Sequence, residues 1–222
     1  MGFQETSVDL RKKAMKTISK PAETDYIIAE ERPKWTETPS PFDKLDEEWY
    51  KIIIFYVFHV PVKDISARAK PLESFRWGIK DNKNDFKKLK SRLVKYGNMT
   101  KNEFRCEESW IKLKQAIEEN NLIDFPSELV RERVSYRKTK SGVNDSLLSH
   151  IRNSFVHGRL AFYSVDSKIY IAMEDIDNKH HVSARMILSK QTLLRWKTII
   201  EGGPQLSCEE LEKTLASEQV EE

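Results

Sequence analysis

The chain has 222 residues, of which 39% are hydrophobic and 33% are charged, so one core can form beneath a heavily charged surface. Only 7 glycines and 8 prolines are present, which disfavours an all-β sandwich with many tight turns and favours a largely helical domain. The net charge of +3 is too small to identify a nucleic-acid-binding protein, and the two cysteines have the spacing of neither a disulfide framework nor a metal site.

No segment of the sequence has the features of a membrane span or a secretory signal. The longest apolar run, IIIFYVF at 52–58, is far shorter than the roughly 18 residues that a transmembrane helix needs. The first residues lack the succession of basic, apolar and small residues that marks a secretory signal. We therefore expect a cytoplasmic protein without a membrane anchor.

Composition divides the chain into three regions. Residues 1–45 include four prolines within the stretch 21–44, which disfavour helix, so we expect a partly irregular N-terminal arm. Residues 46–201 carry the regular apolar patterns of a single domain. Residues 202–222 are rich in glutamate from Glu209 onward and are expected to form an acidic C-terminal tail that is frayed or weakly helical.

The beginning of the domain has an ambiguous pattern. Asp46, Glu47 and Glu48 favour a helix N-terminus, because acidic side chains stabilise the positive end of the helix dipole. The next run, KIIIFYVFHV at 51–60, is rich in β-branched and aromatic residues and fits either a buried strand or a buried helix. We favour a helix that ends near Pro61.

Three helices are expected in the middle of the chain. An apolar stripe with basic residues opposite predicts a helix over 86–97, which Gly97 ends. The same spacing predicts a second helix over 107–121. The stretch that follows Pro126 predicts a third helix over 127–142, with a basic end.

A capped helix comes next and is followed by a change of period. Asn144 or Asp145 is suited to cap its N-terminus, and Gly158 stands where the helix ends. Beyond this glycine the apolar period approaches two, which predicts a β-hairpin at about 159–188. A last helix is predicted over 189–200, so the expected fold class is mainly α.

The segment from Arg152 to His157 groups three side chains with complementary chemistry. Asn153 and His157 are four residues apart and share a helix face, and the long side chain of Arg152 reaches the same volume. An imidazole transfers protons near neutral pH, and a guanidinium binds phosphate through parallel donors. This set suits cleavage of a phosphodiester. Neither a metal nor another cofactor is needed if the nucleophile is the 2′-hydroxyl of RNA.

The sequence R-N-S-F-V-H resembles the R-N-x-x-x-H signature of HEPN domains. The stretch LLSHIRNSFVHGRL is similar to the motif helix of HEPN proteins associated with plasmid and phage defence. The resemblance covers about residues 46–201, of which the motif helix is the specific part. It implies an antiparallel helical bundle with a small hairpin after the motif helix, and a homodimer in which Arg152 and His157 of both chains line one composite cleft.

The resemblance also implies an activity. Members of the family cut single-stranded or looped RNA without metal and leave 2′,3′-cyclic phosphate and 5′-hydroxyl ends, in several cases as toxins or antiphage effectors of abortive infection. By this resemblance His157 is the general base or acid, Arg152 the phosphate clamp and Asn153 the orienting residue. Members that a nucleotidyltransferase antitoxin neutralises often carry tyrosine where this chain has Arg159, so such an antitoxin is not expected, and Arg159 is a candidate phosphate contact.

Basic residues upstream of the motif helix are the candidate RNA-binding residues. Arg137, Lys138 and Lys140 lie there, and Tyr136 is a candidate platform for base stacking. A solvated helix face is the competing interpretation, and it is the commoner one for such charge runs. His150, two residues before the motif, points to a different helix face.

Two other functions compete with the ribonuclease. A HEPN dimer without activity, serving as an RNA-binding or protein-interaction module, would have no need to keep Arg152, Asn153 and His157 together. A DNA-binding regulator would use the basic helices, but the sequence lacks the spacing of a helix-turn-helix.

Overall fold

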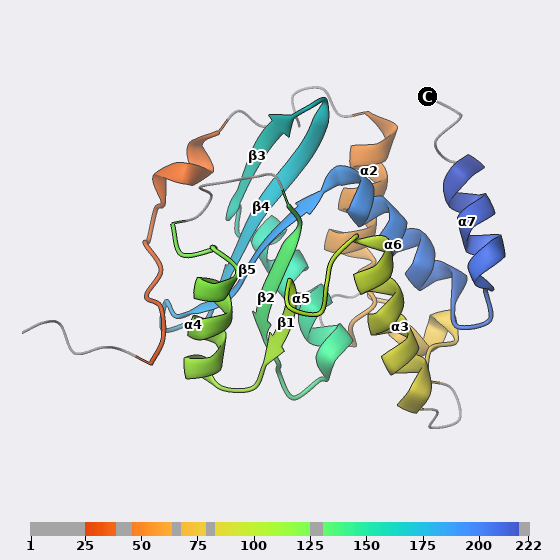
Figure 1. Cartoon of the computed structure of the whole chain (residues 1–222), viewed down its shortest axis with the longest axis horizontal. Helices are drawn as coiled ribbons and strands as arrows, with labels where there is room; N and C mark the ends of the chain where they lie inside the picture. Colours follow the sequence, from red (N-terminus) through yellow and green to blue (C-terminus); the bar gives the residue numbers. More distant parts are fainter. Residues whose placement is uncertain (1–24, 39–45, 64–67, 79–82, 125–130, 218–222) are drawn as a thin grey trace, which may run out of the picture.

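The centre of the structure is a five-stranded mixed sheet with helices on both faces (Figure 1). The computed structural model describes residues 25–38, 46–63, 68–78, 83–124 and 131–217. The strands are β1 (Phe104–Glu107), β2 (Arg133–Arg137), β3 (Leu160–Val165), β4 (Lys168–Ile176) and β5 (Val182–Ser189). Their order across the sheet is β1-β2-β5-β4-β3. The expectation of a mainly α bundle is therefore wrong, and the fold is α/β.

The parallel pair β1–β2 is joined by α4 (Trp110–Glu119), which makes a β-α-β unit, and every other neighbouring pair of strands is antiparallel. The predicted hairpin is present as β3 and β4, with Asp166 and Ser167 at the turn. The third strand of this region, β5, pairs with both β4 and β2. The hairpin therefore extends into a sheet that crosses the whole molecule.

The predicted helix over 127–142 is wrong, because the described part of this stretch forms a strand of the sheet. The described part of this stretch contains β2, in which Val134 and Tyr136 are buried in the larger core. Ser135 and Arg137 alternate with them and contact α4, the first through a hydrogen bond to the Ala116 carbonyl. The period is two, as in a strand. Four basic residues between 131 and 138 made this alternation look like a charged helix end.

Helices cover one face of the sheet and enclose the larger core. They are α2 (Glu47–Ile53), its π-helical continuation η3 (Ile54–Phe58), α3 (Lys83–Tyr96), α5 (Val143–Val156), α6 (Lys190–Gly202) and the short 3-10 helix η4 (Leu72–Phe75). Ile52, Leu148, Met186 and Trp196 are fully buried in this core. The helices expected near 51–60, 86–97, 107–121, 144–157 and 189–200 are thus all present, with bounds shifted by a few residues.

The start of α2 settles the ambiguity between strand and helix. The Asp46 carboxylate accepts a hydrogen bond from the Trp49 backbone N–H at 2.8 Å, which caps the helix. The same carboxylate pairs with Lys190 at 2.6 Å. This ion pair joins the beginnings of α2 and α6.

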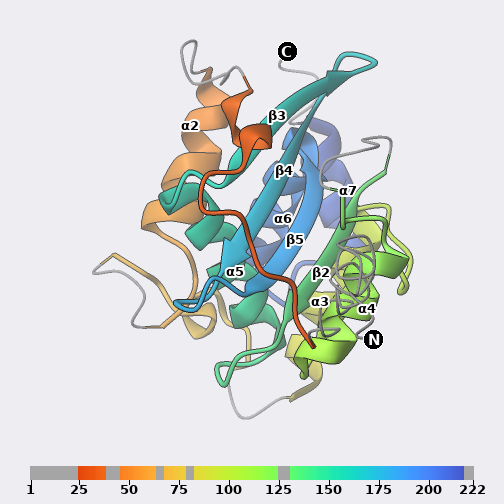
Figure 2. The same cartoon turned by 90° about the vertical axis from the view of Figure 1, so that its left-hand side faces the viewer.

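The other face of the sheet is covered by α4 and by residues 25–38 of the expected arm, which include the short helix η1 (Lys34–Glu37). Figure 2 shows this segment, in orange-red, crossing the strands. Ile28 pairs with His181, and Ala29 is buried in the smaller core. The arm is therefore part of the domain where it is described, and its residues 1–24 and 39–45 lie outside the described part.

The acidic region after α6 contains a further helix, α7 (Cys208–Ser217), which lies beside α6 at the edge of the molecule (Figure 1). Leu211 and Leu215 are buried. The Arg92 guanidinium of α3 donates to the carbonyls of Gly203 and Leu206 in the connection between the two helices. Most of the expected tail thus packs onto the core. Within the described residues, no helix is long and apolar enough to cross a membrane.

Candidate functional site

The motif helix α5 packs its apolar face against the sheet and ends with the candidate residues. Leu147, Leu148 and Ile151 are fully buried, which fixes the rotation of the helix. Arg152 and Asn153 are half-buried in its last turn. His157 follows the last helical residue, and its backbone N–H donates to the Asn153 carbonyl at 2.9 Å.

His157 is the exposed member of the three. Its side chain is open to solvent, and within the described residues it has neither a hydrogen bond nor an ion pair. Arg152 Nη1 lies 3.4 Å from Asn153 Oδ1, and Arg152 Nε is buried with no partner in the described part of the chain. Arg152 and Asn153 are therefore in contact, with His157 one helical turn further on.

A buried histidine–aspartate pair lies directly behind the motif. His150 Nδ1 is 2.6 Å from Asp175 Oδ2 in β4, and both side chains are 5% exposed. His150 Nε2 is 2.8 Å from the Arg137 carbonyl. Both ring nitrogens of His150 are therefore held by oxygen atoms, one of a side chain and one of the backbone.

The Asp175 carboxylate connects this pair to the candidate site. Its Oδ2 also receives Asn153 Nδ2 at 3.4 Å and the Ser183 hydroxyl at 3.1 Å. Asn153 is thus held between Asp175 and Arg152. Sequence reasoning placed His150 on another helix face and missed the link to Asp175.

Two neighbouring carboxylates in an apolar stretch of the sequence could have predicted this arrangement. Glu174 and Asp175 stand in IYIAMEDI (169–176), an otherwise apolar strand. Successive side chains of a strand point to opposite faces, so each carboxylate enters a different layer and needs its own partner there. Asp175 meets His150 on the α5 face. Glu174, on the opposite face, pairs with Arg159 and with Arg185, the latter at 2.8 Å.

Arg159 therefore faces the interior. It is 7% exposed, and its guanidinium donates to Glu174 and to the backbone carbonyls of Glu30 and Glu31, which ties residues 25–38 to the sheet. It has no free face for a phosphate in this arrangement. A structural role accounts for an arginine at this position.

The other candidate RNA-binding residues lie at the end of β2 and in its connection to α5. Arg137 stacks over the Trp110 ring at 4.2 Å, and Lys138 pairs with Glu108 at 2.8 Å. Lys140 is exposed, just before the N-terminus of α5. The 14 residues of α5 separate that end from His157 by about 20 Å. Tyr136 is buried and donates to the Val143 carbonyl, so its ring offers no stacking surface.

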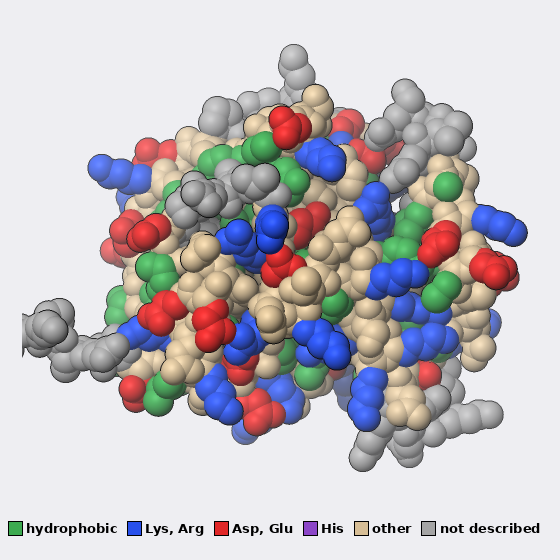
Figure 3. All heavy atoms as spheres, in the orientation of Figure 1, with side chains coloured by type: hydrophobic (Ala, Val, Ile, Leu, Met, Phe, Trp, Pro, Cys, Tyr) green, Lys and Arg blue, Asp and Glu red, His purple; other side chains and the backbone are tan. Residues whose placement is uncertain are grey.

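Side chains of opposite charge are interspersed over the face of the molecule shown in Figure 3, without a broad basic patch. Comparison of the chain with protein-family models, curated proteins and solved structures found no match. The motif helix and the groups that hold it are therefore the features of the molecule that bear on function.

Proposed function

We propose that the protein is a metal-independent endoribonuclease of the HEPN type, with its active centre at the C-terminal end of α5. The observation that carries the proposal is the solvent-exposed imidazole of His157, one turn beyond the contacting pair Arg152 and Asn153. A proton-transfer group that solvent and substrate reach, next to a guanidinium with donors to spare, suits phosphodiester chemistry.

The reaction that fits these groups is an internal displacement. The 2′-hydroxyl of a ribose loses its proton to an imidazole and attacks the adjacent phosphorus, and the bond from phosphorus to the 5′-oxygen of the next nucleotide breaks. That oxygen takes up a proton. The products are a 2′,3′-cyclic phosphate and a 5′-hydroxyl, and the Arg152 guanidinium stabilises the charge on the phosphate oxygens as the displacement proceeds.

Two proton transfers at one phosphate suit two imidazoles, so we propose that the active form is a homodimer with a composite site. His157 of one copy accepts the proton of the 2′-hydroxyl, and His157 of the second copy donates to the leaving oxygen. Val156 supports a contact between copies at this end of α5, because it is next to His157 and 45% exposed. Lys140, beyond the far end of α5, and Lys138 are proposed to hold a distant part of a longer RNA.

The test is cleavage of an end-labelled, mixed-sequence single-stranded RNA in excess EDTA. We compare the unaltered chain with His157→Ala and with the matched control His180→Ala, which removes an exposed imidazole from the loop between β4 and β5. We expect cutting by the unaltered chain and the control, cyclic phosphate ends, and a loss of about 100-fold or more in His157→Ala.

Equal cutting by all three proteins would show that His157 is not the catalytic group. No cutting by an unaltered chain that sediments as a dimer would instead favour the module without activity.

For the biological role we propose a toxin or antiphage effector, as the resemblance implies. Expression of the unaltered chain should then arrest growth, and expression of His157→Ala should not.

A further inference from the structure

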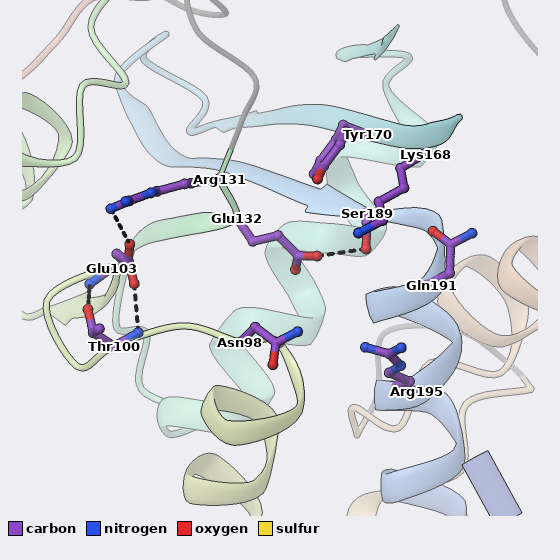
Figure 4. Close-up of a pocket in the computed structure, with 11 residues that line it drawn as sticks. Asn98, Thr100, Glu103, Arg131, Glu132, Lys168, Tyr170, Ser189, Gln191 and Arg195 are labelled. Atoms are coloured by element: carbon purple, nitrogen blue, oxygen red, sulfur yellow. Dashed lines mark hydrogen bonds and ion pairs between the residues drawn. The ribbon is translucent and has the colours of Figure 1, made fainter. Parts of the chain in front are cut away.

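A pocket of about 410 Å³ lies at the other end of the sheet from the candidate active site. It opens between the loop after α3, the residue before β2, the start of β4 and the first turn of α6 (Figure 4). Tyr170 of β4 lines it, whereas Asp175, five residues along the same strand, touches the motif helix. This spacing separates the two sites by about 17 Å.

A half-buried glutamate in the pocket has a free oxygen. Glu132 Oε1 accepts hydrogen bonds from the hydroxyls of Ser189 at 2.6 Å and Thr192 at 2.7 Å. Glu132 Oε2 is buried and has no partner among the described residues, and the side chain points into the pocket in Figure 4. Burial raises the pKa of this carboxyl, although the two hydroxyls oppose the rise. An unpaired buried oxygen costs free energy, which a ligand with an N–H or O–H group recovers.

Cationic side chains line the same space. Arg195 of α6 is half-buried and points into it, and Lys168 of β4 reaches it from the opposite wall (Figure 4). Neither side chain has a hydrogen bond or ion pair within the described chain. Arg131, at the rim, pairs loosely with Glu103 at 3.8 Å. Three cations against two carboxylates leave the lining positive, which favours an anionic ligand whose hydrogen-bond donors are neutral.

We propose that this pocket binds a purine nucleotide. The amino group of the base donates to Glu132 Oε2, the phosphate pairs with Arg195 and Lys168, and the half-buried ring of Tyr170 offers a surface for the base. A zwitterionic amino acid fits less well, because its ammonium group adds a cation to a positive lining. The pocket volume is within the range of roughly 300–1,000 Å³ that small-molecule sites occupy.

The test is isothermal titration of the full chain with AMP and GMP, compared with ribose 5-phosphate and inorganic phosphate. We expect one of the purine nucleotides to bind at least about tenfold more tightly than ribose 5-phosphate. Arg195→Ala and Lys168→Ala should each weaken that binding about tenfold, and Glu132→Gln should reduce the preference over ribose 5-phosphate. Lys179→Ala, the same charge change in the exposed loop between β4 and β5, should leave it unchanged.

A second arm separates a free nucleotide from one within a strand. A 2′-O-methyl oligouridylate with one central adenosine cannot be cleaved, so its binding is independent of the proposed ribonuclease. If this strand binds more tightly than AMP, and Arg195→Ala abolishes the difference, the nucleotide belongs to an RNA. If the purine nucleotides bind no better than ribose 5-phosphate and the strand ignores all three pocket substitutions, the proposal is wrong. Thermal melting of each variant shows whether it remains folded.

Discussion

The His150–Asp175 pair explains how the end of the motif helix is held. Its carboxylate oxygen receives the imidazole, the Ser183 hydroxyl and the Asn153 amide. A buried carboxylate is stable only when such partners replace its hydration. The pair therefore stabilises the contact of α5 with β4 and also fixes the amide that touches Arg152.

Replacing His150 with alanine should cost about 3 kcal/mol of unfolding free energy, because it leaves the buried Asp175 carboxylate without its imidazole partner. The Arg137 carbonyl loses its donor as well. Urea unfolding followed by circular dichroism measures the change. His180→Ala, in an exposed loop, should stay within about 0.5 kcal/mol of the unaltered chain. An equally small effect of His150→Ala would mean that the pair does not stabilise the contact of α5 with β4.

The first turn of α5 contains an acidic residue with an unusual ionisation. Burial, and secondarily the charge of Glu73, raises the pKa of Asp145 to about 6. The folded pKa is above the unfolded value of about 3.9, so the folded protein holds the proton more tightly. This contribution to stability is present near pH 4 and is lost as the pH rises through 6.

Asp145→Asn should therefore be more stable than the unaltered chain at pH 7, by about 1 kcal/mol after allowance for partial exposure. At pH 4 the two proteins should have the same stability. Urea unfolding at both pH values measures the difference in stability between the variant and the unaltered chain. Groups other than Asp145 titrate in both proteins, so their contributions cancel in this difference. A variant that is less stable at pH 7 would show that the ionised carboxylate caps the helix.

The elements differ in how well the sequence predicts them. Helices with one apolar stripe and a local cap, such as α6 with Ser189, are specified within a few residues of chain, and sequence analysis found them. The strand β2 is specified by distant partners, since it pairs with β1 and β5. Its five residues, two of them arginine, are too few for the alternating pattern of a strand to be recognised from the sequence. The strand β1 is similarly short, and it ends where the predicted helix over 107–121 begins.

In the candidate site, too, local contacts were predictable from the sequence and contacts with distant segments were not. The local motif predicts Arg152, Asn153 and His157 as neighbours. In the structure Arg152 contacts Asn153, and the exposed His157 follows the last residue of α5. Asp175, which holds Asn153, comes from a strand 22 residues further along the chain. Arg159 is adjacent in sequence to the motif but enters the opposite layer of the sheet, where Glu174 binds it. Sequence proximity was therefore a poor guide to which charges face the site.

The whole molecule includes its acidic C-terminal region. Replacing the buried Leu211 of α7 with alanine should lower the unfolding free energy by about 2–4 kcal/mol, because the cavity forms where α7 meets the core. Lys213→Ala, on the exposed side of the same helix, is the matched control and should change it by less than about 0.5 kcal/mol. Thermal or urea unfolding measures both. Equal effects of the two substitutions would mean that α7 does not pack onto α6 in solution.

The strand order has a consequence for synthesis of the chain on the ribosome. The central strand β5 is the last strand to be made, yet β2 and β4 both depend on it for pairing. Until residue 189 has left the exit tunnel, a nascent chain holds two unconnected pairs of strands with open edges. The sheet, and with it the surface that residues 25–38 cover, is therefore completed only after β5 has been made. A ribosome stalled before β5 would leave an aggregation-prone fragment, whereas one stalled after α6 would leave most of the core closed.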